Sequence, residues 1–232
     1  MSQLLQLNNI SFKVLNFNND FIILRCAEPQ RLMMIGEIIL KNQFEFIDEV
    51  IATEFEICLK LNVNYSEEKL SQLTNLSFIP KDKRNLYKLP IWFNTHEDWT
   101  QVMKHTHLEK DAIIDILQKG TYSIAMLGFL PGFIYIDGLP SVLHVPRKST
   151  PSKYIPANSL AIGDKYLGTY SLASPGGWHV IGSIACPILD LTKLPPVAIT
   201  GMDQIKIESI TKERYEELQS EKIQLLEYNG II

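Results

Sequence analysis

Short apolar runs separated by glycine and proline dominate the sequence from Thr121 onward, and they constrain the fold more than any other feature. Runs of strand length recur there at residues 122–127, 159–162, 178–184 and 204–207. Many short strands joined by frequent turn residues are typical of closed β structures. The pattern therefore predicts a barrel-like all-β domain in the second half of the chain.

The first part of the chain alternates strand and helix patterns instead. The expected elements are a hairpin of strands 12–15 and 21–26, a helix from Pro29 to Lys41, strands 44–50 and 55–61, a helix capped by Ser66, and a strand over 86–93. The order strand, helix, strand, strand, helix, strand is that of a ferredoxin-like unit. A polar, proline-interrupted stretch at 80–88 marks the predicted boundary.

Helical patterns flank the predicted barrel on both sides. Two helices are expected over 95–119, with Thr95 capping the first and Asp98 completing an approximate capping box. The second helix is expected to stop at Gly120. A further helix, rich in Glu, Lys and Leu, is predicted over 212–227.

Composition argues against several classes of function. The net charge of −4 is unlike the basic domain of a nucleic-acid binder. No apolar run approaches about 18 residues, so no membrane span is expected, and the first ten residues lack the pattern of a signal peptide. Three widely spaced cysteines without a CxxC pair favour the reducing cytoplasm over a disulfide scaffold or a zinc site.

Motifs for metal binding or self-contained catalysis are missing from the sequence. His105 and His107 are two positions apart and do not share a helix face, and the other histidines are isolated, so no metal site is expected. The sequence contains no GxSxG, GxxxxGK[ST] or GxGxxG motif. The chain thus has no ATP motif of its own, which points to one member of a complex rather than a complete enzyme.

The segment 128–133 is an apolar loop framed by Gly128 and Gly132, which permit left-handed turns or close backbone approach. One interpretation is a buried crossover whose aromatic side chains fill the end of the barrel. The other is a pocket wall or a partner contact. The candidates for that wall or contact are Phe129, Pro131, Phe133 and Tyr135.

A second segment, Val145-Pro146-Arg147-Lys148, is stiffened by its prolines. Arg147 is then held in place, and its planar fork suits a carboxylate or a phosphate. The alternative is a solvated arginine on a loop. His144 has the same two interpretations.

A third segment, Ser174-Pro175-Gly176-Gly177-Trp178, predicts a type II turn because proline is followed by glycine. The turn alone is one interpretation. The other is a nest of glycine amides that accepts an anionic oxygen, with Trp178 closing the pocket. Ser174, Gly176, Gly177 and Trp178 are therefore candidate anion-binding residues.

Taken together, the strings MLGFLPGFIYIDGLP, HVPRKSTPSKYIPANSLAIG and LGTYSLASPGGWHVIG resemble the KipI family, also called allophanate hydrolase subunit 1 or the B subunit of 5-oxoprolinase. The resemblance covers residues 86–207, while the first eighty residues match only in pattern. It implies a ferredoxin-like N-terminal domain followed by a cyclophilin-like β-barrel. The expected fold is thus α+β, with domains over 1–85 and 86–210 and a helical tail over 211–232.

The resemblance also implies a function. The family's 5-oxoprolinase uses ATP to hydrolyse 5-oxo-L-proline to L-glutamate, and this chain would be a subunit that is inactive alone. The resemblance implies two partners in the complex. One is the KipA-like C subunit and the other is the LamB/YcsF-like A subunit. Arg147 and the amides of Gly176 and Gly177 are expected to hold the substrate carboxylate and developing negative charge.

Three other functions stay open on the sequence. One is a KipI-like inhibitor of a sensor histidine kinase, and another is a subunit linked to allophanate hydrolase or urea carboxylase. Peptidyl-prolyl isomerase activity rests on fold analogy alone.

Three segments depart from the family's pattern, one of them Pro187-Ile188-Leu189-Asp190, where the family more usually has Phe-Asp-Pro. Asn158 stands where the family usually has glycine, and asparagine tolerates the left-handed geometry of such a turn. Trp92-Phe93-Asn94 replaces the Cys-Tyr-Gly segment of many members, so a family role for that segment does not transfer to this chain.

Overall fold

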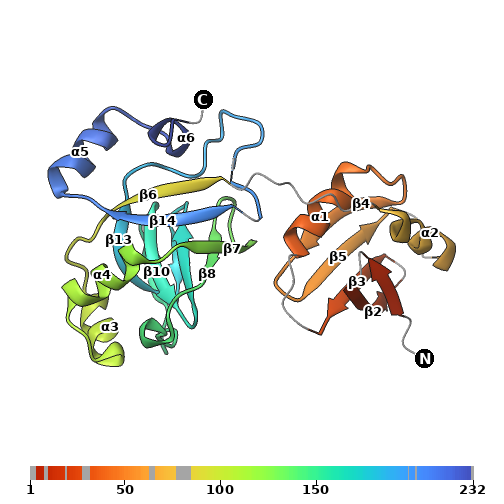
Figure 1. Cartoon of the computed structure of the whole chain (residues 1–232), viewed down its shortest axis with the longest axis horizontal. Coiled ribbons are helices and arrows are strands. Elements are labelled where there is room, and N and C mark those ends of the chain that lie inside the picture. Colours follow the sequence, from red (N-terminus) through yellow and green to blue (C-terminus); the bar gives the residue numbers. More distant parts are fainter. Residues whose placement is uncertain are drawn as a thin grey trace. The chain divides into compact units, whose positions relative to one another are not determined.

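A computed structural model describes residues 4–7, 10–18, 20–27, 32–62, 66–76, 85–197, 199–201 and 203–230. The chain divides into two compact units, Met1–Lys83 and Arg84–Ile232, called here the N-terminal unit and the barrel unit (Figure 1). The first is built on an open sheet with two helices, and the second on a closed barrel with helices packed on it.

The N-terminal unit combines one antiparallel sheet with short helices. Its elements are β1 (Leu4–Leu7), β2 (Ile10–Phe17), β3 (Phe21–Cys26), α1 (Leu32–Lys41), β4 (Ile47–Ala52), β5 (Glu56–Leu61) and α2 (Glu67–Ser71), which continues as a 3-10 turn (Gln72–Asn75). The sheet order is β1-β2-β3-β5-β4, with every pairing antiparallel. The predicted hairpin, now β2 and β3, is confirmed.

Local sequence signals explain most of these elements. Ile57, Leu59 and Leu61 alternate onto the buried face of β5, as the period of two predicts. The Ser66 side chain accepts a hydrogen bond from the Lys69 amide at 3.2 Å, so the predicted N-cap of α2 is confirmed. Pro29, the predicted start of the preceding helix, lies outside the described residues.

Two predicted strands in this region are present, but the start of one and the sheet of the other are wrong. The strand expected over 44–50 begins only at Ile47, because the residues before it form a turn in which the Ile47 amide donates to the Phe44 carbonyl at 3.0 Å. The strand over 86–93, the last in the ferredoxin-like order, is β6 (Leu86–Trp92) and does not join this sheet. It pairs with barrel strands, where its side chains Tyr87, Leu89 and Ile91 are buried.

The barrel unit closes on itself. Its barrel strands are β6, β7 (Tyr122–Leu127), β8 (Ile134–Asp137), β10 (Ser159–Gly163), β11 (Tyr166–Tyr170), β13 (His179–Ile184) and β14 (Gln204–Ser209). Among the described residues these seven strands follow the order β10-β11-β8-β7-β14-β6-β13, and β13 pairs again with β10. The predicted barrel is confirmed, and its closure is consistent with a cyclophilin-like barrel. A separate ribbon pairs β9 (Ser152–Ile155) with β12 (Ser174–Gly176).

Helices pack on the outside of this barrel (Figure 1). They are α3 (Asp98–Thr106), α4 (Lys110–Lys119), a 3-10 turn (Ser141–Leu143), α5 (Lys212–Ser220) and α6 (Leu225–Tyr228). The helix α3 packs against β13 and α4 against β14, which confirms the helix pair predicted over 95–119. The single helix predicted over 212–227 is wrong, because the left-handed residue Lys222 breaks it between α5 and α6.

Candidate functional site

An aromatic cluster forms where β8, β11 and the start of β13 meet. The Phe133 ring lies at its centre, 4.9 Å from the Tyr135 ring, 5.0 Å from Tyr170 and 5.6 Å from Trp178, measured between centroids. Phe129 stands edge-on to Phe133 at 5.4 Å. Phe129 is 60% exposed, whereas the Phe133, Tyr170 and Trp178 side chains are buried. Aromatic pairs of this geometry stabilise one another beyond simple burial.

Two glycines make room for the Trp178 ring. A Cβ atom built on Gly163 in β10 or on Gly168 in β11 would overlap that ring. The indole therefore lies directly across the backbone of both strands, where any other residue would push it out. These glycines determine the position of Trp178, although nothing in the sequence marks them as part of a site.

The cluster forms one side of an open pocket of about 300 Å³, called here the aromatic pocket. Its lining residues come from all three segments singled out in the sequence: Phe129, Phe133, Tyr135, Arg147, Lys148, Pro151, Tyr170, Pro175, Gly176, Gly177 and Trp178. A largely apolar cavity with a few polar groups is the usual form of a small-molecule site, and this volume is large enough for one.

Arg147 is fixed at the rim of this pocket. Its Nε donates a hydrogen bond to Asp164 Oδ2 at 2.8 Å, and its guanidinium carbon lies 5.5 Å from the centroid of the Trp178 ring. Among the described residues its two NH2 groups have no hydrogen-bond acceptor. Arg147 is thus neither buried nor freely solvated, and it presents unused donors to a ligand.

Three of the predicted site residues lie away from the aromatic pocket. The His144 ring nitrogen Nε2 lies 2.9 Å from the Leu139 carbonyl oxygen, outside the pocket. Pro131 accepts a hydrogen bond from the Ser171 hydroxyl at 2.5 Å and does not line the pocket. The Ser174 hydroxyl oxygen is buried, without a hydrogen-bond partner in the described part of the chain.

The predicted type II turn at Pro175-Gly176 is wrong. Ser174–Gly176 is the strand β12, paired antiparallel with β9, and Gly176 does not have the positive φ that such a turn requires. The pairing with β9 overrides the local turn preference. The anion-binding role of Gly176 and Gly177 stays a prediction.

In the loop before β8, only one of the two predicted left-handed glycines has a positive φ. Gly132 has φ +76°, but the other positive φ falls on Phe129, at +71°, rather than on Gly128. A bulky residue in this region is strained, and such strain gathers at functional sites. It holds an exposed aromatic ring at the edge of the pocket.

A second pocket of about 400 Å³, called here the polar pocket, adjoins the first. Its lining residues are Asp98, Gln101, His105, Arg147, Lys148, Ser149, Thr150 and His179. The two pockets share Arg147 and Lys148. The segment 147–150 therefore separates an aromatic cavity from a polar one.

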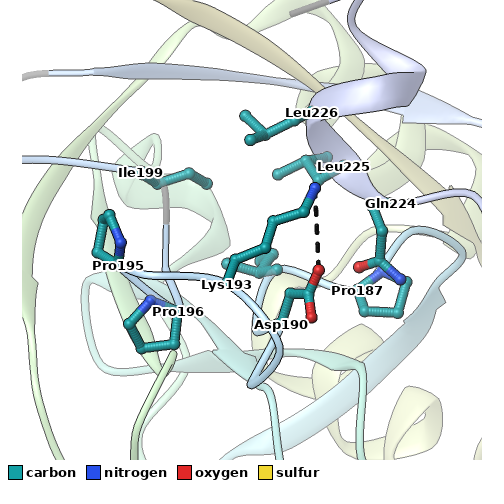
Figure 2. Close-up of a pocket in the computed structure, with 10 residues that line it drawn as sticks. Pro187, Asp190, Lys193, Pro195, Pro196, Ile199, Gln224, Leu225 and Leu226 are labelled. Carbon is teal, nitrogen blue, oxygen red and sulfur yellow. Dashed lines mark ion pairs between the residues drawn. The ribbon is translucent and has the colours of Figure 1, made fainter. Parts of the chain in front are cut away.

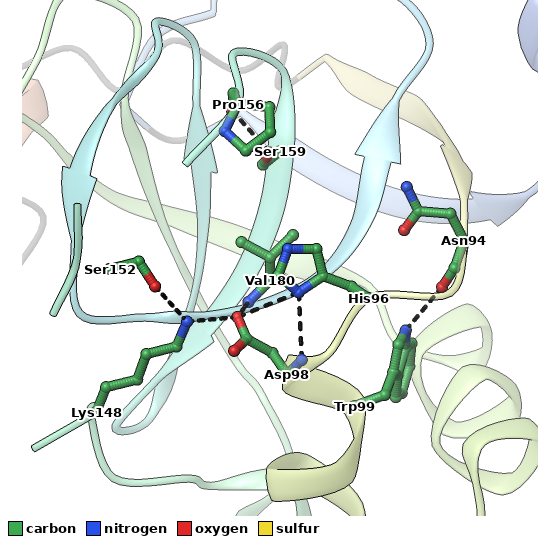
Figure 3. Close-up of polar contacts among 9 residues, drawn as sticks. All are labelled: Asn94, His96, Asp98, Trp99, Lys148, Ser152, Pro156, Ser159 and Val180. Carbon is green, nitrogen blue, oxygen red and sulfur yellow. Dashed lines mark hydrogen bonds and ion pairs between the residues drawn. The ribbon is translucent and has the colours of Figure 1, made fainter. Parts of the chain in front are cut away.

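A buried ion pair lies in the wall of the polar pocket. Figure 3 shows the Lys148 ammonium between the Asp98 carboxylate and the Ser152 hydroxyl, at 2.6 and 2.8 Å. Asp98 Oδ2 also accepts the Val180 amide at 2.8 Å. The predicted capping role of Thr95 and Asp98 is wrong: the N-cap position of α3 is Glu97, and the Asp98 carboxylate is turned toward Lys148.

His179 is a buried histidine with one unused nitrogen. Its Nε2 lies 3.1 Å from the Pro146 carbonyl oxygen, which can only accept, so Nε2 carries the proton. Its Nδ1 is buried and has no hydrogen-bond partner among the described residues. Burial lowers the pKa of His179, which keeps the ring neutral at physiological pH.

Sequence reasoning missed several residues of this site, above all Asp98, His179 and Tyr170. Asp98 had the position of a helix-capping residue, and His179 and Tyr170 sit in apolar strand runs that are typical of a core. Lys148 had a signal, because it directly follows Arg147 in the stiff segment.

A third cavity, drawn in Figure 2, lies between the loop around Pro195 and α6. Its volume is about 30 Å³, which is too small for a small-molecule ligand. Asp190 and Lys193 form a loose ion pair beside it, at 3.9 Å.

Neither a metal-binding group nor a membrane-spanning helix is present in the described ranges. No group of three or more His, Cys, Asp or Glu side chains there is placed to hold a metal ion. No helix in those ranges has the length and apolar character needed to cross a membrane.

Comparison with known proteins finds a match to one family and to named relatives. Residues 24–199 match the family described as carboxyltransferase domain, subdomain C and D. A Bacillus subtilis protein, named as the B subunit of 5-oxoprolinase, is 29% identical over 180 residues, which are 77% of this chain and 72% of that protein. A Haemophilus influenzae protein of the same name is 36% identical over 110 residues. That match spans 47% of this chain and about half, 52%, of the relative's length.

Among solved structures, the Kluyveromyces lactis urea carboxylase is similar with a TM-score of 0.70. The similarity covers 96% of this chain and 24% of that one, at 15% sequence identity. At this identity it shows the fold alone.

Proposed function

The chain belongs to the family of the carboxyltransferase domain, subdomain C and D, and we propose that it acts as the B subunit of an ATP-dependent 5-oxoprolinase. One observation carries the proposal. The region that matches the family, 24–199, contains every residue that lines the aromatic and polar pockets. The relatives named as 5-oxoprolinase B subunits support the same assignment.

The proposed reaction opens the lactam of 5-oxo-L-proline to give L-glutamate. The γ-phosphoryl group of ATP passes to the lactam oxygen and ADP leaves. One water attacks the ring carbon and the ring C–N bond breaks, which leaves an acyl phosphate. A second water hydrolyses this acyl phosphate to L-glutamate and phosphate. In this scheme the aromatic pocket holds the small ring, because its wall of aromatic side chains offers apolar surface to a ligand ring. Arg147 binds the carboxylate through its unused NH2 groups, with the Gly176 and Gly177 amides beside it.

We propose that the ATP chemistry depends on other subunits. The relatives are named as one lettered subunit of an enzyme, which implies a complex, and the sequence contains no ATP motif. The proposed partners are the KipA-like C subunit and the LamB/YcsF-like A subunit. The three subunits would form a complex in the cytoplasm. This chain would then be inactive alone.

We further propose that the N-terminal unit is a variant of the ferredoxin-like fold. In it, β3, α1 and β4 form a β-α-β unit with β5 between the two strands. The strand β2 takes the outer position next to β3 that the last strand of a ferredoxin-like fold usually occupies.

The first test is reconstitution with the two candidate partners. ATP cleavage that depends on 5-oxo-L-proline should require this chain, and a complex equally active without it would reject the proposal. If the chain instead inhibits autophosphorylation of a sensor histidine kinase, the KipI-like alternative replaces it. Dependence on urea or allophanate in place of 5-oxo-L-proline would favour the urea-linked alternative.

Arg147 provides the residue-level test in the same complex. Arg147→Ala should raise the KM for 5-oxo-L-proline about tenfold or more, because a hydrogen-bonded charge pair contributes roughly 1.5–3 kcal/mol. Arg147→Lys should recover part of the loss, since lysine keeps the charge without the fork. Arg25→Ala is a matched control, because Arg25 forms a similar exposed ion pair, with Glu56, in the N-terminal unit. Equal KM values for Arg147→Ala and the wild type would contradict the role.

A further inference from the structure

The two pockets meet at a lysine whose position is fixed. Two of the three hydrogens of the Lys148 ammonium are used, by Asp98 and Ser152. The third has no protein acceptor in the described part of the chain. The Lys148 side chain is 13% exposed and lines both pockets, so this remaining hydrogen is available to a ligand.

The polar pocket is lined mainly by hydrogen-bond donors. Arg147 and Lys148 bring two positive charges to the pocket; Asp98, in its wall, pairs with Lys148, and Asp164, which does not line the pocket, pairs with Arg147. The Ser149 and Thr150 hydroxyls lie next to the two basic residues in sequence and also line the pocket.

The Asp98 carboxylate does not cancel this preference for an anion. It is 6% exposed, and its Oδ2 is already occupied by Lys148 and by the Val180 amide. Its charge therefore serves to hold the ammonium in place, while the NH2 groups of Arg147 donate to no protein acceptor in the described ranges. Ammonium, guanidinium and hydroxyl donors together suit a tetrahedral anion with several acceptor oxygens.

We propose that the polar pocket binds a phosphate group, next to the carboxylate of a ring ligand in the aromatic pocket. The Lys148 ammonium donates its remaining hydrogen to the phosphate and attracts the carboxylate through its charge. The inference rests on the proposed function for the identity of the ring ligand, 5-oxo-L-proline. It assigns Lys148 and Thr150 to phosphate contact and makes Asp98 a positioning residue. An ATP-driven lactam opening needs a phosphate group and the lactam ring side by side. The Lys148 ammonium between them would stabilise both the phosphate and the carboxylate on the ring.

Binding to the full chain tests this directly. Inorganic phosphate and 5-oxo-L-proline are titrated separately and together, by calorimetry and ³¹P NMR. Phosphate should bind, and saturating 5-oxo-L-proline should leave it bound, because the two occupy different pockets. Absence of phosphate binding, or its displacement by 5-oxo-L-proline, would overturn the inference. The second result would show that a carboxylate takes the polar pocket.

Variants separate the two pockets. Thr150→Val should weaken phosphate binding about fivefold or more and leave 5-oxo-L-proline binding unchanged, as expected for the loss of one hydroxyl hydrogen bond to the phosphate. Lys148→Met should weaken both ligands about tenfold or more. Lys153→Met, an exposed lysine that lines neither pocket, should change neither affinity. Phosphate binding that is indifferent to both Thr150→Val and Lys148→Met would also reject the site.

A third titration identifies the source of the phosphate. A non-hydrolysable ATP analogue that binds at least about tenfold tighter than inorganic phosphate points to the phosphoryl donor. Equal or weaker binding points to the released product. Both results support the phosphate site. Failure of the site is distinct from failure of the proposed function, because reconstituted activity can depend on this chain even where phosphate does not bind it.

Discussion

The Asp98 carboxylate lies 2.6 Å from the Lys148 ammonium, although the two residues are 50 positions apart in the chain. The same carboxylate oxygen accepts the Val180 amide, so one oxygen joins the first turn of α3, the segment before β9, and β13. Because both side chains are largely buried, this contact supports the wall shared by the two pockets and also the stability of the barrel unit.

Removing the Asp98 carboxylate should therefore lower the free energy of unfolding far more than removing the carboxylate of an exposed ion pair. Asp98→Ala is expected to lower the free energy of unfolding by about 3–5 kcal/mol, because it leaves a buried ammonium unpaired. Asp164→Ala, which breaks the exposed pair with Arg147, should have a small effect. Urea denaturation of both variants measures the difference. The double variant Asp98→Ala/Lys148→Met should be more stable than the sum of the single losses predicts, and strict additivity would contradict the coupling.

The glycines under Trp178 give a steric prediction. Gly168→Ala should lower stability by about 1–3 kcal/mol, since the new methyl group displaces the indole from its place across β10 and β11. Gly177→Ala is the control, because its Cβ would meet its nearest neighbours at 3.9 Å. Thermal unfolding monitored by near-UV circular dichroism tests both variants. Equal unfolding temperatures for the two variants would contradict the packing of Trp178 against Gly168.

Buried His179 makes stability depend on pH. Its pKa is lowered in the folded protein, so below its ordinary value of 6.5 the unfolded chain binds more protons than the native one. Stability should therefore fall as the pH drops from about 7.5 to about 5.5. His179→Asn, which keeps a donor for the Pro146 carbonyl, should flatten that dependence relative to the wild type. The variant and the wild type are compared by urea midpoints across the pH range, and identical slopes would exclude His179 as the cause.

The thiol of Cys186 should be inert in the native protein. Burial raises its pKa to about 12, so almost no thiolate is present at neutral pH. In a Cys26→Ser/Cys58→Ser background, an alkylating reagent should modify Cys186 only as fast as the protein unfolds. Mass spectrometry in native buffer and in urea makes the comparison. Rapid labelling in native buffer would show that the thiol is accessible.

Local patterns predicted the barrel well, because strand-length apolar runs and turn residues are properties of short segments. The run at 122–127 forms β7 with those bounds, and Asn158 adopts the left-handed φ of +58° that its turn position suggested. Pro175-Gly176 failed for the opposite reason: a tertiary pairing with β9 decided its conformation. The apolar run at 86–93 likewise carried no information about which sheet it would join.

The candidate site was predictable only in part. The three recognised segments line one pocket, because their glycines, prolines and aromatics are visible in sequence. The contact between Asp98 and Lys148 was not visible, since a carboxylate at a helix start has the same local signature whether it caps the helix or pairs with a distant lysine. Gly163 and Gly168 show the same limit, because their role exists only once Trp178 is in place.

The pairing of β14 with β6 has a consequence for how the chain is made. β14 lies between β6, the first barrel strand to be synthesised, and β7, and the Asn85 amide bonds Asp203, 118 positions later. Until β14 leaves the ribosome, β6 and β7 expose unpaired edges that can join with other chains. Through nearly all of the translation of the barrel unit, a chaperone must therefore cover these edges, or synthesis must reach β14 before they pair with another chain.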